Sequence, residues 1–191
     1  MTDDGLGRVL LAIARSAIGA ELGIHAPAAP HHAGLTTPAA TFVTLKQAGE
    51  LRGCIGSLER RRPLGVDVRE NAIAAAFRDP RFPSLENREF ETTSIEVSLL
   101  SADEPVDAGD EERVLAALRP GVDGVIVRHG AQRATFLPQV WDSIADPRAF
   151  LAALKRKAGL PEGFWSPRLN VSRYRVTKWA EPEFQLSEER R

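Results

Sequence analysis

Hydrophobic residues recur every three or four positions in several stretches of the chain, a spacing typical of amphipathic helices. One such stretch covers residues 5–22, and a second begins at Pro63 and ends before Asp79-Pro80. A third covers residues 147–157, where Gly159 provides a stop signal. A shorter helix is predicted over residues 111–118.

Alternation of hydrophobic and polar residues, together with β-branched residues, predicts the strands. Two of the strands form a hairpin around the turn at residues 46–50, and two more flank Gly130. The predicted strands cover residues 41–45, 51–57, 94–100, 125–127, 134–137 and 171–179. Because hairpins dominate the connections, we expect an α+β fold with a mainly antiparallel β-sheet and packed helices.

The remaining segments lack periodicity. Residues 24–40 contain three prolines and are expected to form a long loop, and the last residues form a tail. The length of 191 residues suits one domain, which we place at residues 5–182 with a tail at 183–191. The acidic start does not resemble a secretory signal, and no apolar run is long enough to span a membrane, so a cytoplasmic location is expected.

Composition narrows the function classes. The chain has 25 Lys and Arg against 26 Asp and Glu, so it has no global basic field and we expect neither nucleic acid nor a membrane as a partner. A single cysteine excludes an internal disulfide framework and any multi-cysteine metal site. His25, His31 and His32 lie in the proline-rich loop without further ligands, and we expect no metal and no cofactor.

The one cysteine, Cys54, is the main candidate for chemistry. A nucleophilic cysteine needs a thiolate, which Arg52, His129 or the Arg60–Arg62 run could stabilise. On a regular strand Arg52 and Cys54 share a face, unless a bulge intervenes. The alternative is a small buried residue in a strand, which is the commoner place for a lone cysteine.

The residues around Cys54 also allow two interpretations. Gly53 and Gly56 within one short strand indicate a bulge, or a backbone that another group approaches closely. Asp79 and Arg81 flank a proline and favour a structural corner over an acid–base pair. Arg60–Arg62 favours a charged turn over an anion site, and the aromatic residues of the C-terminal third favour core packing over a ligand pocket.

Several of these segments, taken together and in this order, resemble one family. Leu51-Arg52-Gly53-Cys54-Ile55-Gly56 looks like the signature of the AMMECR-domain family, also called AmmeMemoRadiSam system protein A. The similarity runs from about residue 5 to residue 182. The other segments that carry it are Phe42–Leu45, Asp79–Phe82, Ile95–Ser101, Ala134–Trp141 and Lys157–Leu160 with Trp165.

The resemblance implies a larger α+β lobe with a smaller lobe packed on it. It also implies a link to two partners, a Memo-like protein and a radical S-adenosylmethionine protein, but no defined reaction. Two hypotheses follow for the signature and the residues grouped with it. In the first, the chain is an accessory module that binds these partners, and the glycines permit close packing. In the second, Cys54 is the nucleophile of an enzyme that acts on a small carboxylate- or phosphate-bearing substrate. The candidate binding residues are Arg52, Gly53, Ile55, Gly56, Asp79, Arg81 and His129.

Overall fold

The computed structural model describes residues 4–25, 30–106 and 109–182. By its internal contacts the chain divides into two compact units, residues 1–100 with 177–191, and residues 101–176. The predicted domain at 5–182 is therefore shared between both units. The predicted tail at 183–191 lies outside the described residues, as do positions 26–29 of the predicted loop.

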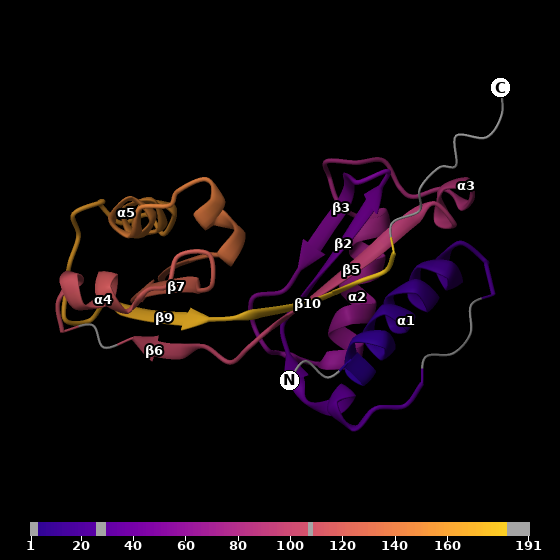
Figure 1. The fold of residues 1–191 in the computed structure, drawn as a ribbon, viewed down its shortest axis with the longest axis horizontal. Helices are drawn as coiled ribbons and strands as arrows, with labels where there is room; N and C mark the ends of the chain where they lie inside the picture. The colour runs from indigo at the N-terminus through magenta and orange to yellow at the C-terminus, as the bar shows by residue number, and fades with distance from the viewer. Residues whose placement is uncertain (1–3, 26–29, 107–108, 183–191) are drawn as a thin grey trace. The chain divides into compact units, whose positions relative to one another are not determined.

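The first unit is built on a four-stranded sheet with the order β10-β5-β2-β3 (Figure 1). Strand β2 pairs with β3 and with β5, and both pairs are antiparallel, as expected for a mainly antiparallel sheet. A two-stranded ribbon joins β1 to β4. The elements of this unit are α1 (Asp4–Glu21), η1 (Ala33–Thr36), β1 (Pro38–Ala39), β2 (Thr41–Gln47), β3 (Glu50–Gly56), β4 (Arg62–Pro63), α2 (Leu64–Phe77), α3 (Asn87–Phe90), β5 (Thr93–Leu100) and β10 (Val176–Ala180).

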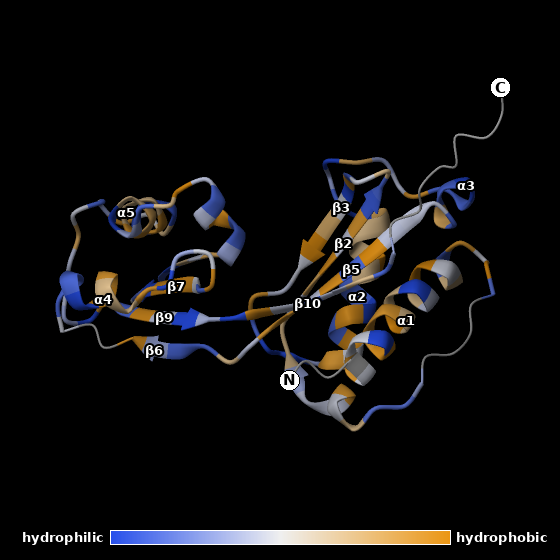
Figure 2. Ribbon diagram, in the orientation of Figure 1, coloured by the Kyte–Doolittle hydropathy of each residue, from blue (hydrophilic) through white to orange (hydrophobic). Residues whose placement is uncertain are grey.

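Helix α2 packs on β2 and β3 and also against α1, which itself contacts β5, and α2 therefore buries residues on most of its circumference. Many of these residues are small, which lets the helix backbone approach the strands closely. Figure 2 shows the hydrophobic residues that run along β2 and across α1 and α2. The largest fully buried side chains of this core are Leu10, Ile18, Val43, Leu45, Val68, Ile95 and Val97.

Two buried polar side chains of α2 hold its first turns in place. Asp67 is fully buried, and its Oδ2 accepts hydrogen bonds from the backbone N–H of Thr41 at 2.9 Å and from the hydroxyl of Ser57 at 2.7 Å. Arg62 donates to the other oxygen of Asp67 at 3.0 Å. Asn71, one turn further along α2, donates to the Thr41 carbonyl at 3.0 Å. The carboxylate has these donors to compensate for its burial, so it stabilises the junction of β2, β4 and α2.

The second unit is built on another four-stranded sheet, with the order β6-β9-β7-β8 and antiparallel pairs throughout. Aromatic residues pack with aliphatic ones in its core: the rings of Trp141 and Phe150 are stacked with centroids 3.6 Å apart, and the partly buried Phe136 meets Phe150 edge-on. Its elements are β6 (Glu104–Val106), α4 (Glu111–Ala117), β7 (Gly124–His129), β8 (Gln132–Phe136), η2 (Pro138–Asp142), α5 (Pro147–Lys157) and β9 (Asn170–Tyr174).

The prediction of a single final strand over residues 171–179 was wrong. The structure has two strands, β9 in the second unit and β10 in the first sheet, separated at Arg175. The backbone of Arg175 is held by Ser101, which donates its N–H to the Arg175 carbonyl at 2.8 Å and accepts the Arg175 N–H on its hydroxyl at 3.0 Å. The sequence alternation does not reveal this change of sheet, because the partner that sets it is distant in the chain.

The proline-rich segment also contains more structure than predicted. It includes η1 and β1. His32, expected in a solvated loop, accepts a hydrogen bond from the Gly34 N–H on its Nδ1 at 3.0 Å and thereby caps η1. Among the described residues, no helix is long and apolar enough to cross a membrane.

Candidate functional site

The signature lies on β3, at the edge of the first sheet. A two-residue turn at Ala48 and Gly49, both with positive φ, joins β2 to β3. Cys54 is opposite Thr44 and Gly53 is opposite Leu45, but the next pair is Lys46 with Leu51. Arg52 is therefore the extra residue of a β-bulge, which confirms one of the two readings of the glycines and removes the constraint that Arg52 and Cys54 share a face.

Arg52 is engaged by Glu89 of α3. Its Nε donates to Oε1 at 2.9 Å and its Nη2 to Oε2 at 3.1 Å, in the bidentate geometry that suits a guanidinium and a carboxylate. The hydrogen bond from Arg52 is the main cause of the lowered pKa of Glu89. Glu89 also accepts the Glu86 N–H, so Arg52 fixes the first turn of α3 to the bulge. Among the residues that the structure describes, Arg52 Nη1 is buried without a hydrogen-bond partner.

The two glycines of the signature are required by internal packing. A Cβ on Gly53 would lie 2.2 Å from the Ala75 carbonyl oxygen of α2. A Cβ on Gly56 would lie 2.3 Å from the ring of Phe42 and 2.6 Å from the Thr41 carbonyl oxygen. Both positions are therefore closed to side chains by the protein itself, and neither glycine leaves space for a substrate. Ile55 is also structural, since it packs on the core of the first unit.

The backbone of Cys54 is bound by the corner that follows α2. Its N–H donates to Asp79 Oδ2 at 2.9 Å, and its carbonyl accepts from Arg81 Nη2 at 3.0 Å. Asp79 and Arg81 also bind each other, with Nη2 and Oδ2 at 2.7 Å. The hydrogen bond from Arg81 holds the pKa of the buried Asp79 carboxyl well below its usual range. Asp79 and Arg81 thus bind the N–H and the carbonyl of Cys54, which would otherwise be unpaired because β3 is an edge strand.

The sulfur of Cys54 is half-buried and lies on the face of the sheet opposite the helices. This orientation follows from its partner Thr44, whose neighbours Val43 and Leu45 point into the helical core. The Thr44 hydroxyl donates to the sulfur at 3.3 Å.

Glu96 of β5 continues this row, because it lies directly opposite Thr44 on the other side of β2. Two lysines bind its carboxylate, Lys46 at 3.6 Å and Lys178 at 3.4 Å. We call the side chains of Thr44, Cys54, Glu96, Lys46 and Lys178 the polar face. The alternation in residues 41–45 and 94–100 signals that Thr44 and Glu96 point away from the core, but only the strand register brings them together with Cys54.

The other predicted groups lie elsewhere. His129 is at the end of β7 in the second unit, where its ring meets Phe164 edge-on at 4.8 Å. In the arginine run, Arg60 donates to the Leu100 carbonyl at 3.0 Å, Arg61 pairs with Glu59, and Arg62 binds Asp67. Within the described part of the chain, no group of three or more His, Cys, Asp or Glu residues is placed to hold a metal ion.

The sequence of this chain matches a known protein family. The model of the AMMECR1 family matches residues 11–179. A protein of Methanothermobacter thermautotrophicus is 40% identical over 141 residues, which are 71% of this chain and 71% of that protein. Protein MK0488 of Methanopyrus kandleri is 37% identical over 188 residues, 93% of this chain and 89% of its own.

A solved structure shares the fold. The crystal structure of the uncharacterized protein PH0010 from Pyrococcus horikoshii matches with a TM-score of 0.78 and 32% identity, over 96% of this chain and 94% of that one. The similarity covers both units, and it agrees with the α+β fold of antiparallel sheets and helices.

Proposed function

Because this chain belongs to the AMMECR1 family, we propose that it acts as a binding component whose polar face docks on a Memo-like protein or a radical S-adenosylmethionine protein. These are the partners that the sequence resemblance implies. Docking needs a stable surface of defined shape rather than an acid–base set. The proposal therefore depends on how the signature uses its residues.

The observation that carries the proposal is that the signature uses its glycines and its arginine for internal contacts. Gly53 faces an α2 carbonyl, Gly56 faces the Phe42 ring, and Arg52 binds Glu89. The result is a rigid edge strand, further fixed at Cys54 by Asp79 and Arg81. The polar face is the part of this strand and its neighbours that another molecule can contact. It carries charges of both signs at its rim.

The test is co-purification of the full chain with each partner, in the wild type and in Lys46→Glu. This change reverses a charge on the polar face and is expected to weaken the complex at least tenfold. Arg69→Glu is the matched control, since it makes the same charge change at an exposed position of α2, on the helical side. Absence of any complex in a concentrated mixture, or equal binding by both variants, would contradict the proposal.

One observation favours a second candidate, an enzyme that uses Cys54 as its nucleophile. Cys54 is partly exposed and its sulfur accepts a hydrogen bond from the Thr44 hydroxyl, so a substrate could reach a sulfur that is held in place. In this second candidate Arg52 does not bind the anionic group of a substrate, because its guanidinium forms an ion pair with Glu89. Alkylation of the single cysteine as a function of pH tests the candidate: a thiol pKa at or above about 8.5, the unperturbed reference, argues against it.

A further inference from the structure

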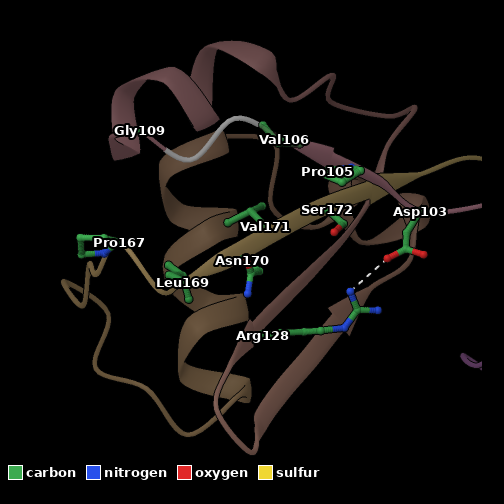
Figure 3. Close-up of a pocket in the computed structure, with 10 residues that line it drawn as sticks. All are labelled: Asp103, Pro105, Val106, Gly109, Arg128, Pro167, Leu169, Asn170, Val171 and Ser172. Carbon is green, nitrogen blue, oxygen red and sulfur yellow. Dashed lines mark hydrogen bonds and ion pairs between the residues drawn. The ribbon is translucent and has the colours of Figure 1, made fainter.

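A pocket of about 590 Å³ opens in the second unit, beside the end of strand β6. This volume is in the range of small-molecule sites in proteins. Figure 3 shows four polar side chains in its lining, Asp103, Arg128, Asn170 and Ser172, with Arg128 extended towards Asp103. None of these residues belongs to the polar face, so the pocket is separate from the function proposed above.

The register of the sheet explains why these side chains meet. Arg128 of β7 lies directly opposite Asn170 of β9, and Ser172 follows two residues later on the same face. The intervening Val171 and its partner Val127 point into the aromatic core. The polar side chains of β7 and β9 therefore lie on the opposite face of the sheet, and Asp103, the residue before β6, joins them there.

The polar groups of the pocket have unused hydrogen-bonding capacity. Arg128 Nη1 donates to Asp103 Oδ2 at 3.0 Å, and both side chains are more than a third exposed. Over residues 4–25, 30–106 and 109–182, the other guanidinium N–H groups of Arg128, the Asn170 amide and the Ser172 hydroxyl make no hydrogen bond. A guanidinium has five N–H donors in a planar fork, so Arg128 can bind a carboxylate while it still contacts Asp103.

The remaining lining consists of Gly109, the exposed Pro105 and Pro167, and the edges of three core residues, Val106, Leu169 and Val171. The accessible apolar wall is therefore formed by the two prolines. A polar centre with an apolar wall selects a ligand that has a charged head and a hydrophobic body.

We propose that this pocket binds a free α-amino acid with a large apolar side chain. The two ionised groups of the pocket carry opposite charges and touch each other, as the ammonium and carboxylate of an α-amino acid do. The ligand carboxylate pairs with Arg128 and Asn170, its ammonium pairs with Asp103, and its side chain packs on the wall. A simple anion would meet the negative Asp103, whereas the zwitterion satisfies both charges.

The test is isothermal titration of the full chain with L-phenylalanine and with two analogues that each lack one charge, 3-phenylpropionate and phenethylamine. Saturable binding of L-phenylalanine is expected, with each analogue at least roughly tenfold weaker, because each loses a charge-assisted contact. No binding of L-phenylalanine at millimolar concentration overturns the proposal. Equal binding of 3-phenylpropionate overturns the role of Asp103 and with it the zwitterion.

Three variants complete the experiment. Asp103→Asn removes one charge with little change of shape, and Arg128→Gln replaces the guanidinium with a shorter neutral amide; both are expected to weaken L-phenylalanine binding roughly tenfold or more. Arg148→Gln is the control, because Arg148 forms an exposed ion pair with Glu112 outside the pocket. Thermal unfolding shows that each variant is folded, and full binding by folded Arg128→Gln or folded Asp103→Asn contradicts the assignment.

Discussion

Asp79 accepts a hydrogen bond from the backbone N–H of Cys54, and the two atoms are 2.9 Å apart. The carboxylate therefore acts on the signature through the main chain and not through the sulfur. Arg81 takes the carbonyl of the same residue, so an acidic and a basic side chain together replace the missing neighbour strand at this point. This relationship explains why Asp79 and Arg81 flank a proline at the end of α2.

We expect Asp79→Ala to lower the free energy of unfolding by about 1–3 kcal/mol, because it leaves the Cys54 N–H without its acceptor and Arg81 without its ion pair. Urea unfolding measures the change. Asp142→Ala is the control: Asp142 is exposed, and its replacement is expected to shift stability by less than about 0.5 kcal/mol. An equal loss in both variants would show that Asp79 makes no special contribution.

Gly53→Ala is expected to destabilise the protein by about 1–3 kcal/mol, since the new methyl group would meet the Ala75 carbonyl of α2 and the helix backbone would have to move. Gly163→Ala is the matched control, because no atom lies within 4 Å of the position of its Cβ. Denaturant midpoints compare the two. A tolerated alanine at position 53 contradicts the packing role of this glycine.

Acid should weaken the first unit through Asp79 and Glu89, whose pKa values are both lowered in the folded protein. A lowered folded pKa stabilises the native state above the unfolded pKa, and this contribution is lost as the pH falls from the ordinary values of 3.8 and 4.5 towards the folded values. Unfolding free energies measured from pH 6 downward should therefore decline more steeply in the wild type than in Asp79→Asn or Glu89→Gln. Parallel pH profiles would refute the assignment.

Tyr174 is the only tyrosine of the chain, so the titration of tyrosine absorbance reports on the folding of the second unit. Burial raises the pKa of Tyr174 to about 12, and its hydroxyl contacts Thr135 Oγ1 at 3.1 Å. Stability from this group is present below the unfolded pKa of about 10 and is lost as the pH rises through the folded value. Tyrosinate absorbance should therefore titrate near pH 12 in the native protein and near pH 10 in urea, and a native transition near pH 10 would contradict the burial.

Thr44→Val removes the hydroxyl that donates to the Cys54 sulfur. Loss of a part-buried hydrogen bond worth about 1 kcal/mol is expected to lower the free energy of unfolding by about that amount. Urea unfolding measures the change. Thr92→Val is the matched control, because its hydroxyl binds the Glu89 carbonyl at an exposed turn, and a shift of less than about 0.5 kcal/mol is expected. Equal stability of the wild type and Thr44→Val would show that this hydrogen bond contributes nothing to the sheet.

Local pattern predicted most helices and strands, because α1, α2, α5 and the two hairpins each carry their own periodicity and stop signals. It also indicated a bulge near Cys54 as one of two interpretations, since two glycines in one strand are a local signal. The partners of the signature were missed. Glu89 and Ala75 meet Arg52 and Gly53 only through tertiary packing, and the division of the last strand at Arg175 depends on Ser101.

The hydrogen bonds between Ser101 and Arg175 have a topological consequence. Ile95 pairs with Glu181 and Ser101 with Arg175, so the chain leaves β5 and returns along β10 in the opposite direction. Residues 101–176 are therefore an insertion whose two ends start from neighbouring, hydrogen-bonded strands. A short turn that joined Leu100 to Thr177 would convert β5 and β10 into an ordinary β-hairpin, and the first sheet would keep all four of its strands.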